Sequence, residues 1–277
     1  MPQLQRLAVA AAQISANQID LTKEQQHYLN RVLRLQAGDR FIAMDGRGHW
    51  WSAILAATET GLFASITEEI AANRELPVTV TLMAALPKGN GFDEVVRQAT
   101  ELGVASIVPV TSDRTLLKPS SQKVDRWRRI AAEAAEQSER QIVPEILEPV
   151  SFDLAVKNCR EKHRFICVAR GENRHLWDCA SGLEPAQPPL LRGEQETEEP
   201  PQPPLLRGEQ ETEELSIAIA VGPEGGWTDG EVERAIEFGF EPVSLGNRIL
   251  RAVTAPMVAL SLVGAAFEKC QSPKIFP

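Results

Sequence analysis

The chain has 277 residues, of which 43% are hydrophobic, so it can bury one large core or two small ones and is not disordered throughout. Its net charge of −9 argues at first against a nucleic-acid partner, and no run of about 18 apolar residues is present that could span a membrane. Four cysteines are too few for a disulfide framework and no signal peptide is recognisable, which together favour the cytoplasm.

The N-terminal part of the chain carries short elements separated by turns. The segment "TKEQQHYLNRVLRLQAGD" (22–39) has apolar residues at helical spacing, which predicts a short helix ended by Gly38. Three predicted strands follow, at residues 40–45, 50–56 and 62–67. Short strands at this spacing are typical of a small barrel, so we expect a first domain over residues 1–72.

From residue 73 to the C-terminus, predicted strands and helices alternate. The predicted strands cover residues 78–84, 104–110, 164–169, 216–221 and 242–245, and the predicted helices cover residues 93–102, 123–140, 228–238 and 253–267. Thr228 and Glu231 have the spacing of a capping box at the start of one helix. Nearly continuous apolar strands between helices indicate an α/β domain with a parallel sheet over residues 73–277, whose ligands bind beyond the carboxyl ends of the strands.

One segment of this second domain is a tandem repeat. Residues 187–199 read "QPPLLRGEQETEE", and residues 202–214 repeat them. The repeats contribute −6 to the net charge of −9, which leaves −3 for the rest of the chain. Their Pro- and Glu-rich composition offers too little apolar surface to offset the entropy lost on ordering, so residues 185–215 are predicted to be a disordered insertion. A solvated loop without function is favoured over a partner-binding tail.

Two glycine-containing loops follow predicted strands. They read "GPEGGW" (222–227) and "GNRILR" (246–251). Glycines let a ligand approach the backbone closely, but neither a Walker lysine nor the G-x-G-x-x-G spacing is present, which argues against a phosphate ligand. Backbone N–H and C=O groups suit a nucleoside. Two ordinary turns are the alternative, and the succession of two such loops favours a ligand site.

These loops resemble those of a known family. The sequences "VGPEGGWTDGEVERA" and "SLGNRILR", followed by Thr-Ala, are similar to motifs of the SPOUT superfamily of RNA methyltransferases, and specifically of the RsmE-type enzymes. Further similar motifs occur in the same order: "HYLNRVLRLQAGD" (27–39), "GFDEVVRQATELGV" (91–104) and "RWRRIAAEAAEQSERQIVPEI" (126–146). The resemblance spans most of residues 20–265 outside the repeats.

The resemblance implies a fold and an activity. A PUA-like or OB-like barrel that binds RNA would come first in the chain. A SPOUT domain would follow, which is an α/β domain whose parallel sheet contains a trefoil knot. The chain would form a homodimer and act in rRNA processing and ribosome biogenesis. It would use S-adenosyl-L-methionine to methylate N3 of the uridine at position 1498 (standard rRNA numbering) of 16S rRNA in the small ribosomal subunit.

The residues that would hold the cofactor follow from the resemblance by position. They are Ala169, Gly222, Pro223, Glu224, Gly225, Gly226, Leu245, Gly246, Asn247, Ile249 and Leu250. Ala169 begins a third segment, residues 169–171, that follows a predicted strand and is expected to contact the cofactor as well. Two alternatives to this activity remain open. One is a non-catalytic RNA-binding or ribosome-assembly protein on the same fold, and the other is a SPOUT methyltransferase with another RNA target.

Methylation at N3 of uridine requires loss of a proton and stabilisation of negative charge on the two neighbouring carbonyl oxygens. Arginine supplies several donors for such charge. Arg251 and Arg248 are the first catalytic candidates, and Arg140 with Glu136 is the second pair, for which a solvated salt bridge within the helix is the alternative. No general base stands out. The family usually has Glu at the position of Val253, and this chain departs from it there.

Contacts to RNA are expected from basic groups that meet phosphate and from an aromatic ring that stacks on a base. The predicted contacts are His27, Arg31, Arg34, Trp50, Lys88 and Arg114. Because neighbouring residues of a strand face opposite sides, one of Trp50 and Trp51 is expected in the core. The cysteines and histidines between residues 159 and 179 lack paired C-x₂-C spacing, so no metal site is predicted.

Overall fold

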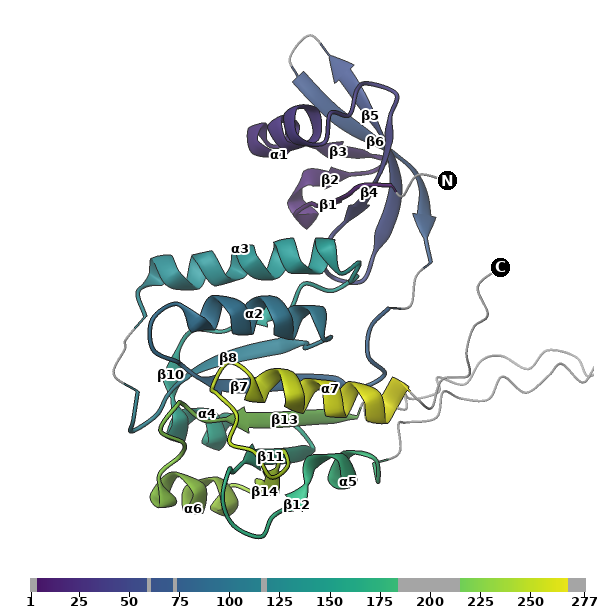
Figure 1. Ribbon diagram of the computed structural model, residues 1–277. Helices are drawn as coiled ribbons and strands as arrows, with labels where there is room; N and C mark the ends of the chain where they lie inside the picture. The colour runs from purple at the N-terminus through teal and green to yellow at the C-terminus, as the bar shows by residue number, and fades with distance from the viewer. Residues whose placement is uncertain (1–3, 59–60, 72–73, 116–118, 184–214, 269–277) are drawn as a thin grey trace, which may run out of the picture.

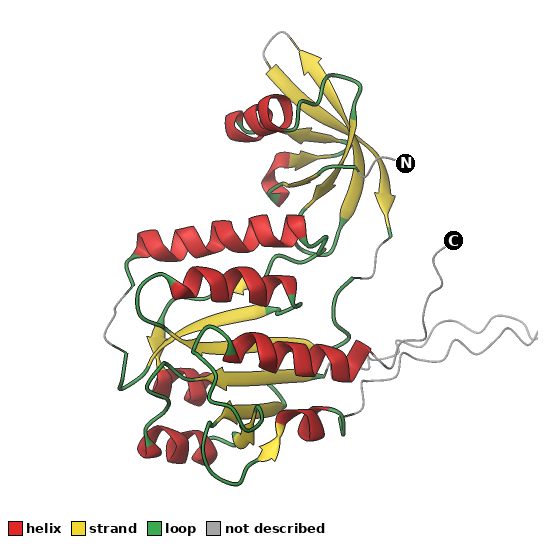
Figure 2. Ribbon diagram, in the orientation of Figure 1, coloured by secondary structure: helices red, strands yellow, loops and turns green. Residues whose placement is uncertain are grey.

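The computed structural model of the protein describes residues 4–58, 61–71, 74–115, 119–183 and 215–268. These residues form two β-sheets that share no strand (Figures 1 and 2). The predicted insertion at residues 185–215 lies outside the described residues except for its last member, Leu215, which is buried. The predicted boundary between residues 72 and 73 also lies outside them.

The first sheet has six strands in the order β1-β4-β5-β6-β3-β2. The three predicted strands are confirmed as the antiparallel run β4, β5 and β6, whereas three shorter strands were not predicted. The bounds are Arg6–Ala8 (β1), Ile14–Ser15 (β2), Gln18–Asp20 (β3), Arg40–Met44 (β4), Trp50–Thr58 (β5) and Gly61–Ile70 (β6), with a 3-10 turn at Ala11–Gln13 (η1). The sheet packs around a separate apolar core that includes Ile19, Leu29 and Phe41.

The predicted helix over residues 22–39 is shorter than expected. It consists of α1 (Lys23–His27), capped by the side chain of Thr22, and a π-helical turn, η2 (Tyr28–Val32). The chain then reverses at Arg34, whose φ of 58° is left-handed, and the N–H of Leu35 donates back to the carbonyl of Leu29. The prediction that Gly38 ends the helix is therefore wrong, because Gly38 belongs to the turn that follows.

The second sheet confirms the predicted parallel arrangement. Its strands run in the order β10-β8-β7-β13-β11-β14-β12, and β9 pairs with β8. Every recorded pairing in this sheet is parallel. The bounds are Thr79–Ala85 (β7), Ser106–Thr111 (β8), Glu145–Ile146 (β9), Val150–Ser151 (β10), His163–Cys167 (β11), Arg174–His175 (β12), Ser216–Val221 (β13) and Glu241–Ser244 (β14).

Helices cover both faces of this sheet (Figure 2) because its central strands are apolar on both sides. Ile217 and Ile219 of β13 face one core, which α2, α3, α5 and α7 cover, while Ala218 and Ala220 face a second core covered by α4 and α6. The bounds are Gly91–Glu101 (α2), Ser121–Gln137 (α3), Phe152–Asn158 (α4), Leu176–Ala180 (α5), Asp229–Glu237 (α6) and Ala255–Glu268 (α7). The capping box of α6 is confirmed, whereas α4 and α5 were not predicted.

The first sheet contacts the second half of the chain at the end of α3 (Figure 1). Trp50 and Met44 pack with Ala135 of α3 in a small apolar cluster. Oε1 of Glu136 accepts the backbone N–H of Ala8, in β1, over 2.5 Å. These contacts hold the N-terminal sheet against the helical layer.

Candidate active site

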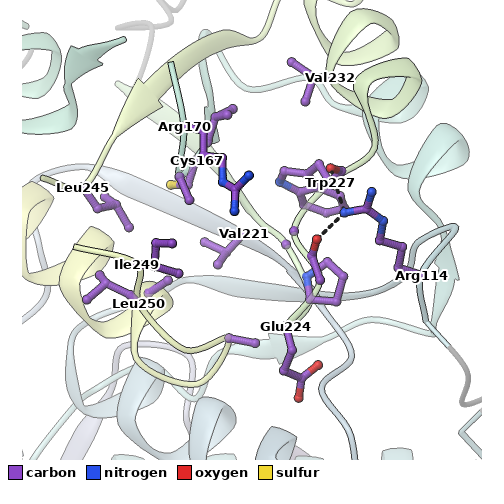
Figure 3. A pocket seen from close by; sticks show the side chains of 18 of the residues that line it. Arg114, Cys167, Arg170, Val221, Glu224, Trp227, Val232, Leu245, Ile249 and Leu250 are labelled. Carbon is purple, nitrogen blue, oxygen red and sulfur yellow. Dashed lines mark hydrogen bonds between the residues drawn. The ribbon is translucent and has the colours of Figure 1, made fainter. Parts of the chain in front are cut away.

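A cavity of about 470 Å³ lies beyond the carboxyl ends of three neighbouring strands, β11, β13 and β14. Its position follows from the strand register, because Cys167 at the end of β11 lies opposite both Val221 of β13 and Val243 of β14. The volume falls in the range of small-molecule sites. The segments that follow the three strands supply most of the lining, and the segment after β8 adds Arg114 (Figure 3).

The loop after β13 has a shape set by Gly226 and Trp227. Gly226, with a φ of 69°, closes a tight turn in which its N–H donates to the carbonyl of Pro223 over 2.8 Å. The indole of Trp227 packs on the ring of Phe152, with 4.3 Å between ring centroids. A Cβ on Gly222 would lie only 3.2 Å from that indole, so glycine lets the backbone pass close to the ring.

Glu224 connects this loop to the loop after β7. Its Oε1 accepts the backbone N–H of Lys88 over 2.9 Å, and Figure 3 shows its side chain directed away from Val221 and Trp227. This contact satisfies a backbone N–H group of the neighbouring loop. Lys88 itself is exposed.

Arg114 holds the loop from the other side. Its Nη1 donates to the carbonyl of Gly225 and lies 3.5 Å from the carbonyl of Trp227. The preceding residue is held as well, because the N–H of Asp113 donates to the fully buried carboxylate of Glu231 over 2.9 Å. Arg114, which the sequence predicts as an RNA contact, therefore lines the cavity and hydrogen-bonds its wall.

The loop after β14 forms the opposite wall. Gly246 has a φ of 103°, and its N–H donates to Oγ of Ser244 over 3.1 Å. Leu245 and Leu250 present apolar side chains, and Ile249 is 71% exposed at the edge of the cavity. This loop supplies an apolar surface of the kind that a flat base can contact.

The structure brings most of the predicted cofactor residues together. Ten of the eleven line the cavity, namely Ala169, Gly222, Pro223, Glu224, Gly225, Gly226, Leu245, Gly246, Ile249 and Leu250. Asn247 is exposed and does not line it. Of the first catalytic candidates, Arg248 lines the cavity, whereas Arg251 is exposed beside it and its carbonyl accepts the N–H groups of Thr254 and Ala255 at the start of α7.

Val253 has apolar surroundings in this chain. It is half-buried and packs against the core below α7. A Cβ on Gly91, at the start of α2, would lie 2.9 Å from a methyl group of Val253. The side chain of Val253 therefore packs the segment before α7 against the start of α2.

The structure contradicts the predicted placement of the second catalytic pair, Arg140 and Glu136, on one helix. Helix α3 ends at Gln137, and Arg140 lies beyond it because Glu139 adopts a left-handed φ of 60°. Arg140 is only 4% exposed and pairs with Glu75, while Glu136 binds Ala8. Neither residue lines the cavity. Both have structural contacts, and the alternative of a solvated salt bridge within the helix is wrong, while the catalytic role of the pair stays a prediction.

The predicted RNA contacts are distributed over different parts of the molecule. His27 of α1 and Arg31 of η2 are exposed, as is Arg34 in the turn that follows. Trp50 is 3% exposed and lies in the core, so the prediction that it stacks on a base is wrong. Trp51 is the half-buried member of the pair and stacks on His49, with ring centroids 5.8 Å apart.

The cysteines have the properties of protonated thiols. Burial raises the pKa of Cys159 to about 12 and that of Cys179 to about 11, and it raises the pKa of Cys167, on the cavity wall, to about 12. Among the residues that the structure describes, no three His, Cys, Asp or Glu side chains are grouped closely enough to hold a metal ion. None of the described helices has the length and apolar character needed to cross a bilayer.

Several lining residues were not predicted. They are Cys167, Val168, Val221, Trp227, Asp229, Val232, Ala252 and Ala255, whereas Arg170 belongs to the predicted contact segment 169–171. Trp227 is the informative one, since it directly follows the predicted site segment 222–226 in the sequence. Its position after a strand end was the available signal.

The chain matches two families of known proteins. Residues 74–264 match the family described as RNA methyltransferase domain, and residues 21–67 match the RNA methyltransferase PUA domain. A relative from a Synechocystis species, named ribosomal RNA small subunit methyltransferase E, is 44% identical over 95% of this chain and 78% of its own. A relative of the same name from Bacillus subtilis is 30% identical over 90% of each chain.

Solved structures give a consistent result. A ribosomal RNA small subunit methyltransferase E from Neisseria gonorrhoeae, solved bound to S-adenosyl methionine, superposes with a TM-score of 0.75. The two sequences are 27% identical, and the similarity covers 96% of this chain and 98% of that one.

Proposed function

Because the chain belongs to the RNA methyltransferase family that includes the ribosomal RNA small subunit methyltransferase E proteins, we propose that it transfers a methyl group from S-adenosyl-L-methionine to N3 of a uridine in 16S rRNA. The observation that carries this proposal is the cavity at the ends of β11, β13 and β14. A structural neighbour with the same fold binds S-adenosyl methionine.

The residues of the cavity fit this cofactor. Its walls combine the backbone groups of two glycine-containing loops with apolar side chains such as Val221, Leu245 and Leu250. Among the described residues no lysine lines it, and one of its arginines, Arg114, is used to hydrogen-bond the loop after β13. The bound cofactor supplies a methyl group on a positively charged sulfur.

The chain would contribute orientation and charge stabilisation to the transfer. The braced loop after β13 keeps the cavity wall in one position, which favours the in-line alignment that methyl transfer requires. Arg248, which lines the cavity, and Arg251, which is exposed beside it, would donate hydrogen bonds to the uracil oxygens as N3 loses its proton.

The remaining parts of the proposal concern the RNA and the assembly. Residues 1–72 would form the RNA-binding domain, with His27, Arg31 and Arg34 as exposed basic residues, and residues 73–277 the methyltransferase domain. The active form would be a homodimer with a knotted C-terminal domain, and its substrate would be the small ribosomal subunit in the cytoplasm.

The test is transfer of a labelled methyl group to small ribosomal subunits that lack the modification, followed by identification of the modified nucleoside. We expect 3-methyluridine. Cofactor binding without transfer would favour a non-catalytic RNA-binding protein on this fold, and a different modified nucleoside would assign another target.

A further inference from the structure

Arg170 is a charged residue of the cavity to which the proposed function gives no role. It follows β11 closely and lines the cavity. Figure 3 shows its guanidinium group extended from the strand end toward the middle of the cavity, above Val221 and between Cys167 and Trp227. A cation in this position faces the space that a ligand would fill.

Of the other four charged residues in the described lining of the cavity, two hydrogen-bond its walls, and two, Asp229 and Arg248, are exposed. Arg114 binds the carbonyl of Gly225, and Glu224 binds the N–H of Lys88. Arg248 belongs to the exposed loop after β14. Arg170 is exposed as well, and within the described ranges of the chain its guanidinium group makes no hydrogen bond or ion pair.

Cys167, Val221 and Trp227 lie around this guanidinium group in Figure 3, so a ligand that fills the cavity would remove water from it. A charge that loses water is unfavourable unless the ligand supplies an opposite charge. The planar fork of arginine matches a carboxylate in a bidentate arrangement. The ligand chemistry that fits Arg170 is therefore a carboxylate attached to an otherwise uncharged or cationic molecule.

We propose that Arg170 pairs with the α-carboxylate of S-adenosyl-L-methionine and so determines which end of the cavity receives the amino-acid part of the cofactor. The apolar side formed by Leu245 and Leu250 is then left for the base. This inference rests on the proposed function. It makes Arg170 a cofactor-binding residue with a role separate from the backbone groups of the two loops.

The experiment compares two ligands on the full-length chain by isothermal titration calorimetry. One is S-adenosyl-L-methionine, and the other is 5′-methylthioadenosine, which has the nucleoside but no amino-acid carboxylate. Arg170→Gln is expected to weaken binding of the first by about tenfold to a hundredfold, the loss typical of a hydrogen bond to a charged group, and to leave binding of the second unchanged. Arg170→Lys keeps the charge and is expected to recover part of the affinity.

Arg174→Gln is the matched control, since this exposed arginine lies four residues away, pairs with Glu241 and does not line the cavity. Equal weakening of both ligands by Arg170→Gln would overturn the proposal and give Arg170 a role in shaping the cavity. Unchanged cofactor binding with weaker RNA binding would assign Arg170 to the RNA. A wild-type protein that binds neither ligand would overturn the proposed function itself.

Discussion

Nη2 of Arg140 lies 2.6 Å from Oε2 of Glu75, a residue 65 positions earlier in the chain. Nη1 of Arg140 donates to the carbonyls of Thr100 and Val104, so the guanidinium group binds three segments at once. The other oxygen of Glu75 accepts the N–H of Gln141 over 2.8 Å. This pair therefore joins the segment before β7 to the ends of α2 and α3.

Replacing Arg140 with Ala is expected to reduce stability. Removing one member of a buried ion pair leaves the other charge without its partner, which typically costs about 3–5 kcal/mol. The free energy of unfolding in urea measures this loss. Arg97→Ala is the control, since Arg97 forms an exposed pair with Glu94 and its loss should cost about 0.5 kcal/mol or less. An Arg140 variant of normal stability that has lost methyl transfer would support the catalytic assignment.

Replacing Arg251 with Ala is expected to abolish methyl transfer while cofactor affinity stays within about tenfold of the wild-type value. The reason is that Arg251 is exposed next to the cavity without lining it, and its contact with α7 uses only the backbone carbonyl. Single-turnover transfer and calorimetry measure the two quantities. A fully active variant would remove Arg251 from the mechanism.

Gly222→Ala is expected to weaken cofactor binding. The added methyl group would press on the indole of Trp227, which is held by Phe152, and such overpacking costs about 1–3 kcal/mol. The dissociation constant for S-adenosyl-L-methionine measures the effect. Gly182→Ala is the control, because its Cβ would meet only backbone oxygens at 3.6 Å or more. Equal affinity of both variants and the wild type would show that the indole of Trp227 can shift to make room for the added methyl group.

The three described cysteines are expected to resist alkylation in the native protein. With a pKa of about 12, Cys159 is ionised to roughly one part in ten thousand at pH 8, and only the thiolate reacts. Iodoacetamide labelling in buffer and in urea, in a Cys270→Ser background, tests this. Rapid native labelling at pH 8 would contradict this prediction.

Folding raises the pKa values of these thiols, so the protonated thiols contribute to the free energy of unfolding. That contribution is complete below the unfolded pKa of about 8.5 and is lost as pH rises toward 12.

Deleting residues 187–214 is expected to leave cofactor affinity unchanged. The flanking residue Leu215 precedes the start of β13 and is buried, whereas the cavity lies at the other end of that strand. Calorimetry and thermal unfolding of the deletion variant check this. A variant that fails to fold would show that the repeats are not a surface insertion.

The long elements of the second sheet were predictable because each carries its own pattern. The apolar run of β13 and the capping box of α6 predict the observed segments within one residue at each end. Short elements such as β1 and α5 have too few residues for a period, and β1 exists because Leu7 pairs with Ala43 in a strand more than thirty residues away. Pairing of that kind is absent from any local window of sequence.

The site was predictable in its loops and less so in its side chains. Glycines beyond strand ends mark where a ligand can approach, and those positions line the cavity. The role of a charged residue depends instead on partners far away in sequence, such as Glu75 for Arg140 and Gly225 for Arg114. Likewise, alternation along β5 separates Trp50 from Trp51 but does not say which of them faces the core.

Trp227 gives the cavity an optical signal of its own. It is the one tryptophan of the five in the chain that lines the cavity, and all five lie in the described part. Its Nε1 is buried and, among the described residues, has no hydrogen-bond partner, which leaves the indole emission sensitive to a polar group that arrives beside it. With the other four tryptophans replaced by Phe, the fluorescence of this single ring would follow the filling of the cavity in real time without any added label.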